Sequence, residues 1–501
     1  MKTNKHNKSI MKAQINKIVI QTLFLVILVV VVTIPVNTQA QQISFGKEYW
    51  NVEYHDTYGE SLIQMHNGEY ILIGNDVEFS PRKTVLIHID SMGEIIQNSL
   101  IEAEPWTNTE SIYEMNSYLL LLCGTTWNFS TSSGGAFIQK RDLNDSIYNQ
   151  IVYNNISYYN AGDLQMTNEG SYIFCGHALN TNLSMYDGYI NMVDSNGILL
   201  WQAIINDGID TTHECINKVC QLTDGSFMAT GWSRSNATMN LPYNLFVAHV
   251  SADGQVLNTR VYLPRYSGYS NSGRGICPTS DGNALVLSHE MPGPGLSWQI
   301  CLYKITPQCD TLWTKFVPGP VGYGSSGSDM RKTSDGGFLI AGSAYLDYKP
   351  YAMIARLDGE GNQIWAEAHD NGNSMTFMVN VTETQDLGAA AIGYTYNSGD
   401  YHIYFLKTDT LGLVTTIPEV LKTNDNIVLG PNPVQDLCHI QFEQNTRQIH
   451  LLDMQGRTLL SHNITTGQTS IKLSLGHLPS GVYLLRISSQ KGEIIKKLVK
   501  W

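Results

Sequence analysis

A turn followed by a short apolar strand that ends in a small residue recurs along the chain. The fragments NGEYILIG, DGSFMATG and DGGFLIAG are three copies of this pattern. The strands end at seven positions, which are Gly74, Gly124, Gly176, Gly231, Ser288, Gly342 and Gly393. Successive ends lie 50 to 57 residues apart. A period of this length predicts an array of similar supersecondary units.

A second pattern follows each apolar strand and consists of an alternating strand, a tight turn and another strand. VLIHIDSMGEIIQN and AMIARLDGEGNQIWAE are examples. An aspartate at the strand end recurs as Asp90, Asp142, Asp194, Asp358 and Asp409, and a turn glycine recurs as Gly93, Gly197, Gly254, Gly361 and Gly412. Aspartate accepts backbone N–H groups in such turns, and glycine tolerates positive φ. We therefore predict a structural role for these acids and no metal binding.

The two patterns together give about four short strands in each repeat, with no amphipathic helix between them. A four-stranded sheet cannot bury both of its faces alone, so consecutive sheets are expected to pack around an axis. The sequence predicts an all-β protein with a seven-bladed β-propeller over residues 41–417. The fragment TSDGGFLIAGSA resembles repeats of bacterial exported propellers, and this resemblance covers most of residues 45–416.

The chain also carries a signal for how the ring closes. Trp201, Trp313 and Trp365 each lie four residues after the turn position, and the spacing from Gly46 to Trp50 repeats this before the first full unit. We therefore predict that residues 45–56 form the outer strand of the last blade, which protects the seam of the ring. A spare N-terminal strand is the alternative.

The first 40 residues have the composition of an export signal. Five lysines and no acid precede the apolar run Ile18–Val32, Pro35 breaks this run, and Thr38-Gln39-Ala40 offers small residues for cleavage. We predict a signal peptide over residues 1–40 that is cleaved after Ala40, leaving no stable transmembrane span. An uncleaved membrane anchor is the alternative, and Met11 is an equally good start.

The pattern changes after a linker predicted at residues 418–426. Residues 427–501 contain four short motifs in order, which are GPNPV from Gly430, LLDMQGR from Leu451, LPSGVYL from Leu478 and the basic KKLVK from Lys496. They resemble the type A C-terminal sorting domain of the type IX secretion system. The motif residues are Pro431, Asn432, Pro433, Asp453, Gly456, Gly481, Tyr483, Lys496 and Lys497.

The resemblance implies several expectations. The strand pattern of residues 427–501 fits a small Ig-like antiparallel β-sandwich. The resemblance adds recognition by the type IX translocon and sorting machinery. It also implies that the protein is secreted or displayed on the surface of a Gram-negative bacterium.

Charge and cysteine content narrow the class of partner. The whole chain carries −13, and the lysines of the first 40 residues and the basic surplus of residues 421–501 leave −22 on residues 41–420. Such an acidic body argues against nucleic acid and anionic membranes as partners. Cys123 and Cys175 occupy equivalent positions in neighbouring repeats, as do Cys220 and Cys277, and such positions are too far apart to bridge, so we predict buried thiols. Cys215 with Cys220 and Cys301 with Cys309 remain plausible local pairs.

No catalytic constellation is evident along the chain. His213-Glu214 lacks the second histidine of a zinc motif because position 217 is Asn, and the stretch Asn206–Asp210 lacks the ligand ladder of a calcium loop. We predict no cofactor and no metal. Carboxylate pairs for glycoside cleavage would come from different repeats, so the sequence leaves them open.

The loops after the second strand of each repeat are rich in aromatic residues among Asn, Ser and Thr. The candidates for ligand binding are Trp127, Phe129, Trp232, Tyr243, Trp298, Tyr345 and Tyr348. Rigid rings beside hydroxyl and amide groups suit contact with sugars or protein surfaces. The alternative is that these rings fold back over the blade edges.

Three functions fit the sequence. The first is a non-enzymatic surface protein that binds a glycan or a protein. The second is a secreted hydrolase or lyase acting on polysaccharide or peptide, which requires titratable groups that converge in the central channel or on the loop face. The third is a purely structural surface module.

Overall fold

The structure is a computed structural model, and it divides the chain into two compact units, Met1–Val414 and Thr415–Trp501. It describes residues 44–49, 56–77, 82–101, 106–116, 118–128, 130, 133–153, 159–180, 182–209, 211–235, 242–266, 269–291, 293, 297–372, 374–397, 399–414, 428–430, 434–442, 446–452, 458–465, 467–479, 481–489 and 492–500. The predicted signal peptide, its cleavage after Ala40 and the linker at residues 418–426 lie outside these ranges.

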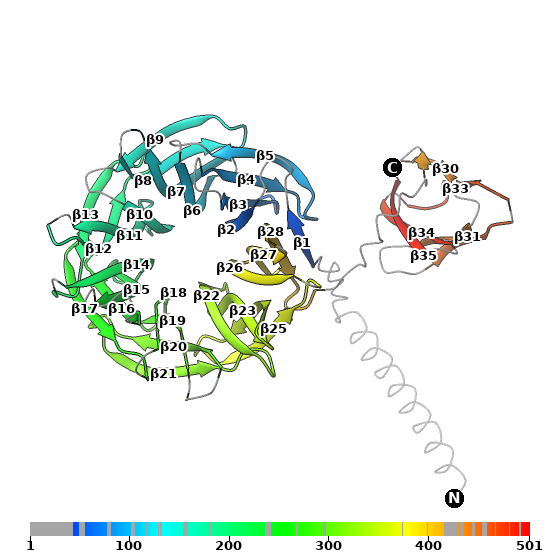
Figure 1. Cartoon of the computed structure of the whole chain (residues 1–501). Helices are drawn as coiled ribbons and strands as arrows, with labels where there is room; N and C mark the ends of the chain where they lie inside the picture. The colour runs from blue at the N-terminus through cyan, green and yellow to red at the C-terminus, as the bar shows by residue number, and fades with distance from the viewer. Residues whose placement is uncertain are drawn as a thin grey trace, which may run out of the picture. The chain divides into compact units, whose positions relative to one another are not determined.

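The described part of the first unit folds into seven four-stranded antiparallel sheets arranged in a ring (Figure 1). The first three sheets are β2 (Thr57–Gln64), β3 (Tyr70–Asp76), β4 (Thr84–Ile89) and β5 (Ile95–Ile101); β6 (Trp106–Asn116), β7 (Leu119–Asn128), β8 (Ser133–Asp142) and β9 (Ile147–Tyr153); and β10 (Tyr159–Met166), β11 (Tyr172–Asn180), β12 (Met185–Val193) and β13 (Leu199–Ile205). The next three sheets are β14 (Thr212–Gln221), β15 (Phe227–Ser235), β16 (Asn244–Val250) and β17 (Val256–Tyr262); β18 (Gly275–Pro278), β19 (Ala284–Glu290), β20 (Gln299–Ile305) and β21 (Thr311–Val317); and β22 (Gly324–Lys332), β23 (Phe338–Leu346), β24 (Lys349–Leu357) and β25 (Gln363–His369).

The last sheet joins the two ends of the ring. It contains β26 (Met375–Glu383), β27 (Ala389–Asn397) and β28 (Asp400–Thr408), and its outer strand is β1 (Phe45–Tyr49). The register runs from Phe45 opposite Lys407 to Tyr49 opposite Ile403. The prediction of an N-terminal outer strand is therefore confirmed for residues 45–49, whereas residues 50–55 lie outside the described part.

The hairpin turns have the predicted chemistry. In the first sheet, Asp90 Oδ1 accepts the backbone N–H groups of Met92 at 2.8 Å and Glu94 at 2.9 Å, and Gly93 has φ +80°. A Cβ at Gly93 would lie 2.4 Å from the Phe45 ring of the neighbouring sheet. The recurring glycine thus serves both the turn and the packing between sheets, and a side chain at Gly93 would be strained and would clash with Phe45.

The core lies between successive sheets and is strongly apolar. One cluster joins Leu121 and Ile138 of the second sheet to Phe174 and Tyr189 of the third, and each of these residues is almost fully buried. All eight cysteines are buried and unpaired. The prediction that they behave as small hydrophobic residues is confirmed, and neither local pair forms a disulfide.

The innermost strand of six of the seven described sheets carries a β-bulge at the same level. The extra residues are Glu60, Glu110, Gly162, Asn217, Ser328 and Val379. A bulge places an additional residue without a partner and redirects the side chains beside it. These bulges line the interior of the ring and position the polar groups described below.

The second unit has two sheets that share one core. The sheets are β29 (Val428–Gly430), β30 (Leu437–Gln441) and β33 (Ser470–Ser474), and β31 (Thr446–Leu452), β32 (Thr458–Asn463), β34 (Gly481–Ser489) and β35 (Gly492–Lys500). Cys438 and Leu473 of the first sheet belong to the same cluster as Ile449, Leu485 and Leu498 of the second. Among the described residues of the chain, no helix has the length and apolar character needed to cross a bilayer.

Candidate functional site

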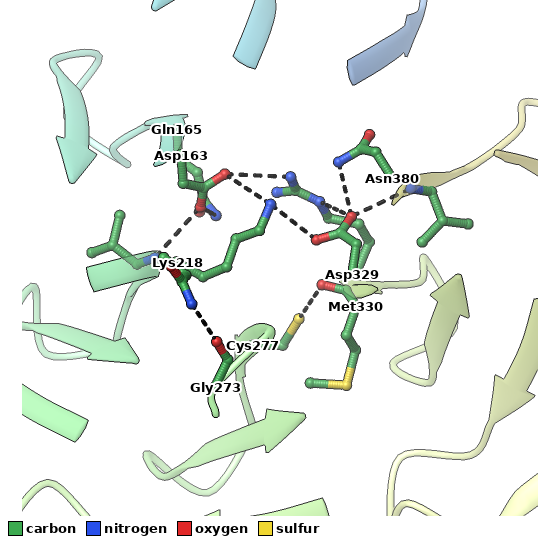
Figure 2. A network of polar contacts seen from close by, with 12 residues as sticks. Asp163, Gln165, Lys218, Gly273, Cys277, Asp329, Met330 and Asn380 are labelled. Carbon is green, nitrogen blue, oxygen red and sulfur yellow. Dashed lines mark hydrogen bonds and ion pairs between the residues drawn. The ribbon is translucent and has the colours of Figure 1, made fainter. Parts of the chain in front are cut away.

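A buried ion network occupies the interior of the ring (Figure 2). Lys218 of β14 places its Nζ 3.2 Å from Asp329 Oδ1 of β22 and 3.6 Å from Asp163 Oδ1 of β10. The side chains of both aspartates are almost fully buried. Burial acts to lower the pKa of Lys218, but the two carboxylates outweigh it and raise the pKa. Lys218 is therefore a permanent cation that bridges two sheets.

Arg331 and Asn380 complete this network. Arg331 donates from Nε to Asp329 Oδ2 at 3.1 Å, and its Nη2 lies 3.4 Å from Asp163 Oδ1. Asn380 Nδ2 donates to Asp329 Oδ2 at 2.9 Å. Two buried acids are thus matched by two cations, and the side chains come from four different sheets. This balance of buried charges favours a structural role for the network.

A second group of titratable residues adjoins the network. Glu60 and Glu110 are the bulge residues of β2 and β6, and their carboxyl groups share a hydrogen bond, so one of them carries a proton. Burial raises the pKa of both groups, and their mutual proximity raises that of Glu60 further. Asn108 Nδ2 donates to Glu110 Oε1. The pair titrates as a unit and holds a proton near neutral pH.

The stability of the ring is expected to depend on this proton. The pKa values of the two carboxyl groups in the folded protein lie above the value of about 4.3 in the unfolded chain. Their contribution to the free energy of unfolding is therefore fully present below about pH 4.3 and is lost as the pH rises through the folded-state pKa values. The pKa of Glu110 is raised to about 7, so the loss should fall between about pH 5 and 8. In the Glu110→Gln variant, the loss in the free energy of unfolding over this pH range should be smaller by about 1–3 kcal/mol, as measured by denaturant titrations at several pH values. If the free energy of unfolding of the variant depended on pH as that of the unchanged protein does, the shared proton would be contradicted.

Aromatic and polar side chains lie next to the carboxyl pair. Tyr58 Oη donates to Asn108 Oδ1 at 3.3 Å, and Arg82 Nη1 approaches the same two atoms at 3.4 Å. The guanidinium of Arg82 also lies 5.3 Å from the Trp106 ring centre. Tyr394 meets the Tyr58 ring edge-on at 6.1 Å. No sequence motif indicated this cluster, because its members come from the first, second and last sheets.

A cavity of about 440 Å³ opens into the interior of the ring. It is lined by the C-terminal halves of β2, β6, β10, β22 and β26, and Arg331 and Asn380 of the ion network contribute to its wall. Thr57 at the start of β2 pairs with Asp76 at the end of β3, so the loops after the second strands lie at the opposite end of the inner strands. The cavity is therefore remote from the predicted loop face.

Three of the predicted ligand-binding aromatics lie in strands and not in loops. Trp127 belongs to β7, Trp232 to β15 and Tyr345 to β23. The sequence analysis placed these residues in loops because it assumed that the second strand of each repeat ends at the recurring glycine. In the structure, the second strand continues past this glycine and stays paired with the first and third strands. The Trp127 ring packs over Gly134, where a Cβ would lie 2.6 Å from the ring. Trp127 and Tyr345 are half-buried, and burial raises the pKa of Tyr345.

The other candidates form two small groups and one isolated position. Trp232 meets Tyr243 edge-on at 4.9 Å. The ring centre of Trp298 lies 5.2 Å from that of His289 and 6.0 Å from that of Tyr269. Tyr348 is fully exposed in the turn between β23 and β24, and Phe129 lies outside the described residues.

The two motifs weighed for metal binding meet in the fold. Ser233 Oγ donates to Glu214 Oε1 at 3.2 Å and approaches Asp207 Oδ2 at 3.4 Å. Burial raises the pKa of Glu214 to about 8. His213 Nδ1 accepts the backbone N–H of Tyr186 at 3.0 Å. In the part of the chain that the structure describes, no three His, Cys, Asp or Glu side chains converge as metal ligands.

A cysteine and a histidine also meet beneath the loop face. His177 Nδ1 lies 3.1 Å from Cys215 Sγ. Burial raises the pKa of Cys215 to about 12 and lowers that of His177 to about 4. Both groups are neutral at physiological pH, so the thiol lacks the activation of a catalytic nucleophile.

Several predicted sorting residues lie in the core and ladder of the second unit. Tyr483 is buried and donates from Oη to the Pro479 carbonyl at 2.7 Å. Gly481 pairs with Lys500, and Lys496 and Lys497 lie in β35 opposite Leu485 and Leu484. Pro431, Asn432, Pro433, Asp453 and Gly456 lie outside the described residues.

These features define an all-β, propeller-like first unit followed by a small β-sheet unit. Residues 429–501 match the family model described as the secretion system C-terminal sorting domain. This domain is the signal of the type IX system, so the protein is exported across the outer membrane and is secreted or placed at the cell surface. No curated protein matches the chain.

Several solved structures are similar in fold. The β-propeller domain of the Trilobed protease from Pyrococcus furiosus has 8% identity and a TM-score of 0.42, and the match covers 71% of this chain and 95% of that one. The α-L-arabinofuranosidase Arb93A from Fusarium graminearum has 9% identity and a TM-score of 0.41, covering 63% and 97%. A Bacteroides caccae protein of unknown function has 12% identity and a TM-score of 0.37, covering 63% and 94%.

Proposed function

We propose that this exported protein is a non-enzymatic glycan-binding module whose ligand lies on the loop face of a closed seven-bladed propeller. The observation that carries the proposal is the pair of aromatic groups around Trp232 and Trp298, each beside hydrogen-bonding side chains. Tyr243 is 37% exposed, and Trp232 and Trp298 are half-buried. Each of these side chains therefore keeps part of its surface accessible to a ligand.

The chemistry around these rings supports a neutral sugar as ligand. The Arg234 guanidinium lies 4.8 Å from the Tyr243 ring centre and donates to Tyr243 Oη at 3.2 Å, which fixes the ring. His289 is uncharged at neutral pH because burial lowers its pKa to about 4. A rigid aromatic platform with Arg234 as a fixed hydrogen-bond donor suits the apolar face and the hydroxyl groups of a sugar ring, whereas an acidic protein surface would meet the acidic body unfavourably.

A hydrolase or lyase remains the second candidate because titratable groups do converge inside the ring. The specific observation is the Glu60–Glu110 pair. However, these carboxyl groups are in direct hydrogen-bond contact. Glycosidases need separations of about 5–5.5 Å for retention or about 6.5–9.5 Å for inversion. The geometry therefore supports a proton-sharing pair more than it supports glycoside cleavage.

The architecture proposed for this function keeps the boundaries expected from the sequence. Residues 41–417 would form the seven blades, residues 418–426 the linker and residues 427–501 an Ig-like sandwich. The seven sheets in a ring and the β1–β28 pairing support the first assignment. The common core of the two small sheets supports the last one.

The double variant Trp232→Ala, Trp298→Ala tests the loop face. We expect it to lose retention on a glycan array by more than about tenfold, since an aromatic ring can bury up to about 150–250 Å² and each Å² of buried apolar surface contributes about 25 cal/mol. Circular dichroism should show that the ring remains folded. Leu312→Ala, an exposed change on the outer strand β21, is the matched control. Unchanged retention by the folded double variant would exclude this face.

A further inference from the structure

The cavity remote from the loop face has an uneven distribution of charge. Arg331 and Lys332 are the cations in its lining, and Glu383 is the acid. Glu383 is already engaged, because its Oε1 lies 3.3 Å from Arg356 Nη2 and its Oε2 accepts the Ser334 N–H at 2.7 Å. Lys332 is exposed and has no ion pair among the described residues. Because the charge of Arg331 is already matched by Asp163 and Asp329, Lys332 is the cation of this lining whose charge is not matched among the described residues.

Arg331 is held rigidly for recognition. A guanidinium has five N–H donors. Asp329 and Asp163 take the Nε–H and one Nη2–H, and the other donors have no partner within the described part of the chain. Asp163 and Asp329 hold the Arg331 side chain in place, and Arg331 lines the cavity. A ligand that accepts from its remaining N–H groups would therefore cost little further conformational entropy.

The rest of the wall combines apolar and polar surface. Ile63, Tyr113 and Met166 are partly exposed, and Gln165 and Thr382 supply an amide and a hydroxyl. The volume of about 440 Å³ lies within the range of about 300–1,000 Å³ that holds small molecules. A cavity with one fixed guanidinium, one free ammonium and an apolar wall suits an organic anion of modest size.

We propose that this cavity is a second binding site and that it takes a small ligand with a carboxylate group, received by Arg331 and Lys332. A carboxylate matches the planar donors of Arg331, and Lys332 adds a point charge at the mouth. The apolar wall receives the remainder of the ligand. This site is separate from the loop face, so either can be correct without the other.

Two sources of carboxylate are distinguished by matched probes. Titration calorimetry on the full chain would compare D-galacturonate with D-galactose, and N-acetylleucine with N-acetylleucine amide. We expect one carboxylate to bind and its neutral partner to fail. Binding of galacturonate would identify an acidic sugar, and binding of N-acetylleucine would identify a peptide end. Equal binding within each pair, or no binding up to about 10 mM, would overturn the proposal.

Two variants locate the binding. The Lys332→Gln variant should fold normally, because this side chain is exposed, and its affinity for the carboxylate ligand should be lower by about fivefold. Lys315→Gln on β21 is the matched control and should change nothing. Arg331→Lys keeps a charge above the two aspartates but loses the planar donors, and it should weaken binding by about tenfold or more. Full affinity in both site variants would refute the assignment.

Discussion

Removal of residues 427–501 is expected to trap the protein in the periplasm and to leave almost none outside the cell. The type IX machinery recognises the sorting domain, and the matching residues 429–501 all lie in this segment. Because the chain divides between Val414 and Thr415, the truncation should not unfold the ring. Immunoblots of periplasm and culture medium, or surface labelling of intact cells, provide the measurement.

A reporter fusion gives the complementary control. A periplasmic reporter that carries residues 418–501 should appear outside the cell, whereas the same reporter without them should not. Normal export of the truncated protein would contradict the role assigned to the domain. Failure of the fusion alone would show that export also needs features of the first unit.

Replacement of Lys218 is expected to cause the largest loss of stability from a single substitution in the ring. Lys218→Ala leaves Asp163 and Asp329 buried with Arg331 as their remaining cationic partner. Removing one member of a buried ion network costs about 3–5 kcal/mol, because the desolvated charge that remains is not compensated. Denaturant titration followed by tryptophan fluorescence would measure the change in the free energy of unfolding.

A double variant separates charge from packing. Lys218→Met with Asp163→Asn removes one cation and one anion together, and it should lose less stability than Lys218→Ala. Lys332→Gln, at an exposed lysine, is the surface control and should shift the free energy of unfolding by less than about 0.5 kcal/mol. If Lys218→Ala matched this control, the network would carry no stabilising role.

The repeat, the turns and the seam could be predicted because their signals are local. The Asp90 turn requires an acceptor and a positive-φ residue within four positions, and the sequence shows both. The outer strand at Phe45–Tyr49 could be found because its spacing copies that of later units. Each of these features depends on the period of the chain, which is visible in a single sequence.

The interior of the ring could not be predicted in the same way. Lys218 meets Asp163 and Asp329, which lie in two other repeats and carry no common motif. Only the bulges bring these side chains to one level, and a bulge depends on ladder register. The Glu60–Glu110 pair was missed for the same reason.

The aromatic candidates show a different limit. The sequence located the aromatic-rich segments but could not tell where each strand ends. Trp127 lies in β7 and covers Gly134, whereas Tyr348 lies in a turn and is fully exposed. Both side chains are aromatic, and the length of the strand ladder decides which ring is available to a ligand.

The pairing of β1 with β28 has a consequence for how the protein can be made and handled. Phe45 must pair opposite Lys407, so the final sheet cannot be completed until nearly the whole first unit is available for folding. Contacts this remote in sequence form slowly, and the waiting strand is an open edge in the meantime. An affinity tag placed directly before Phe45 would interfere with the pairing of β1 and β28. A tag or label is therefore better placed within an exposed turn.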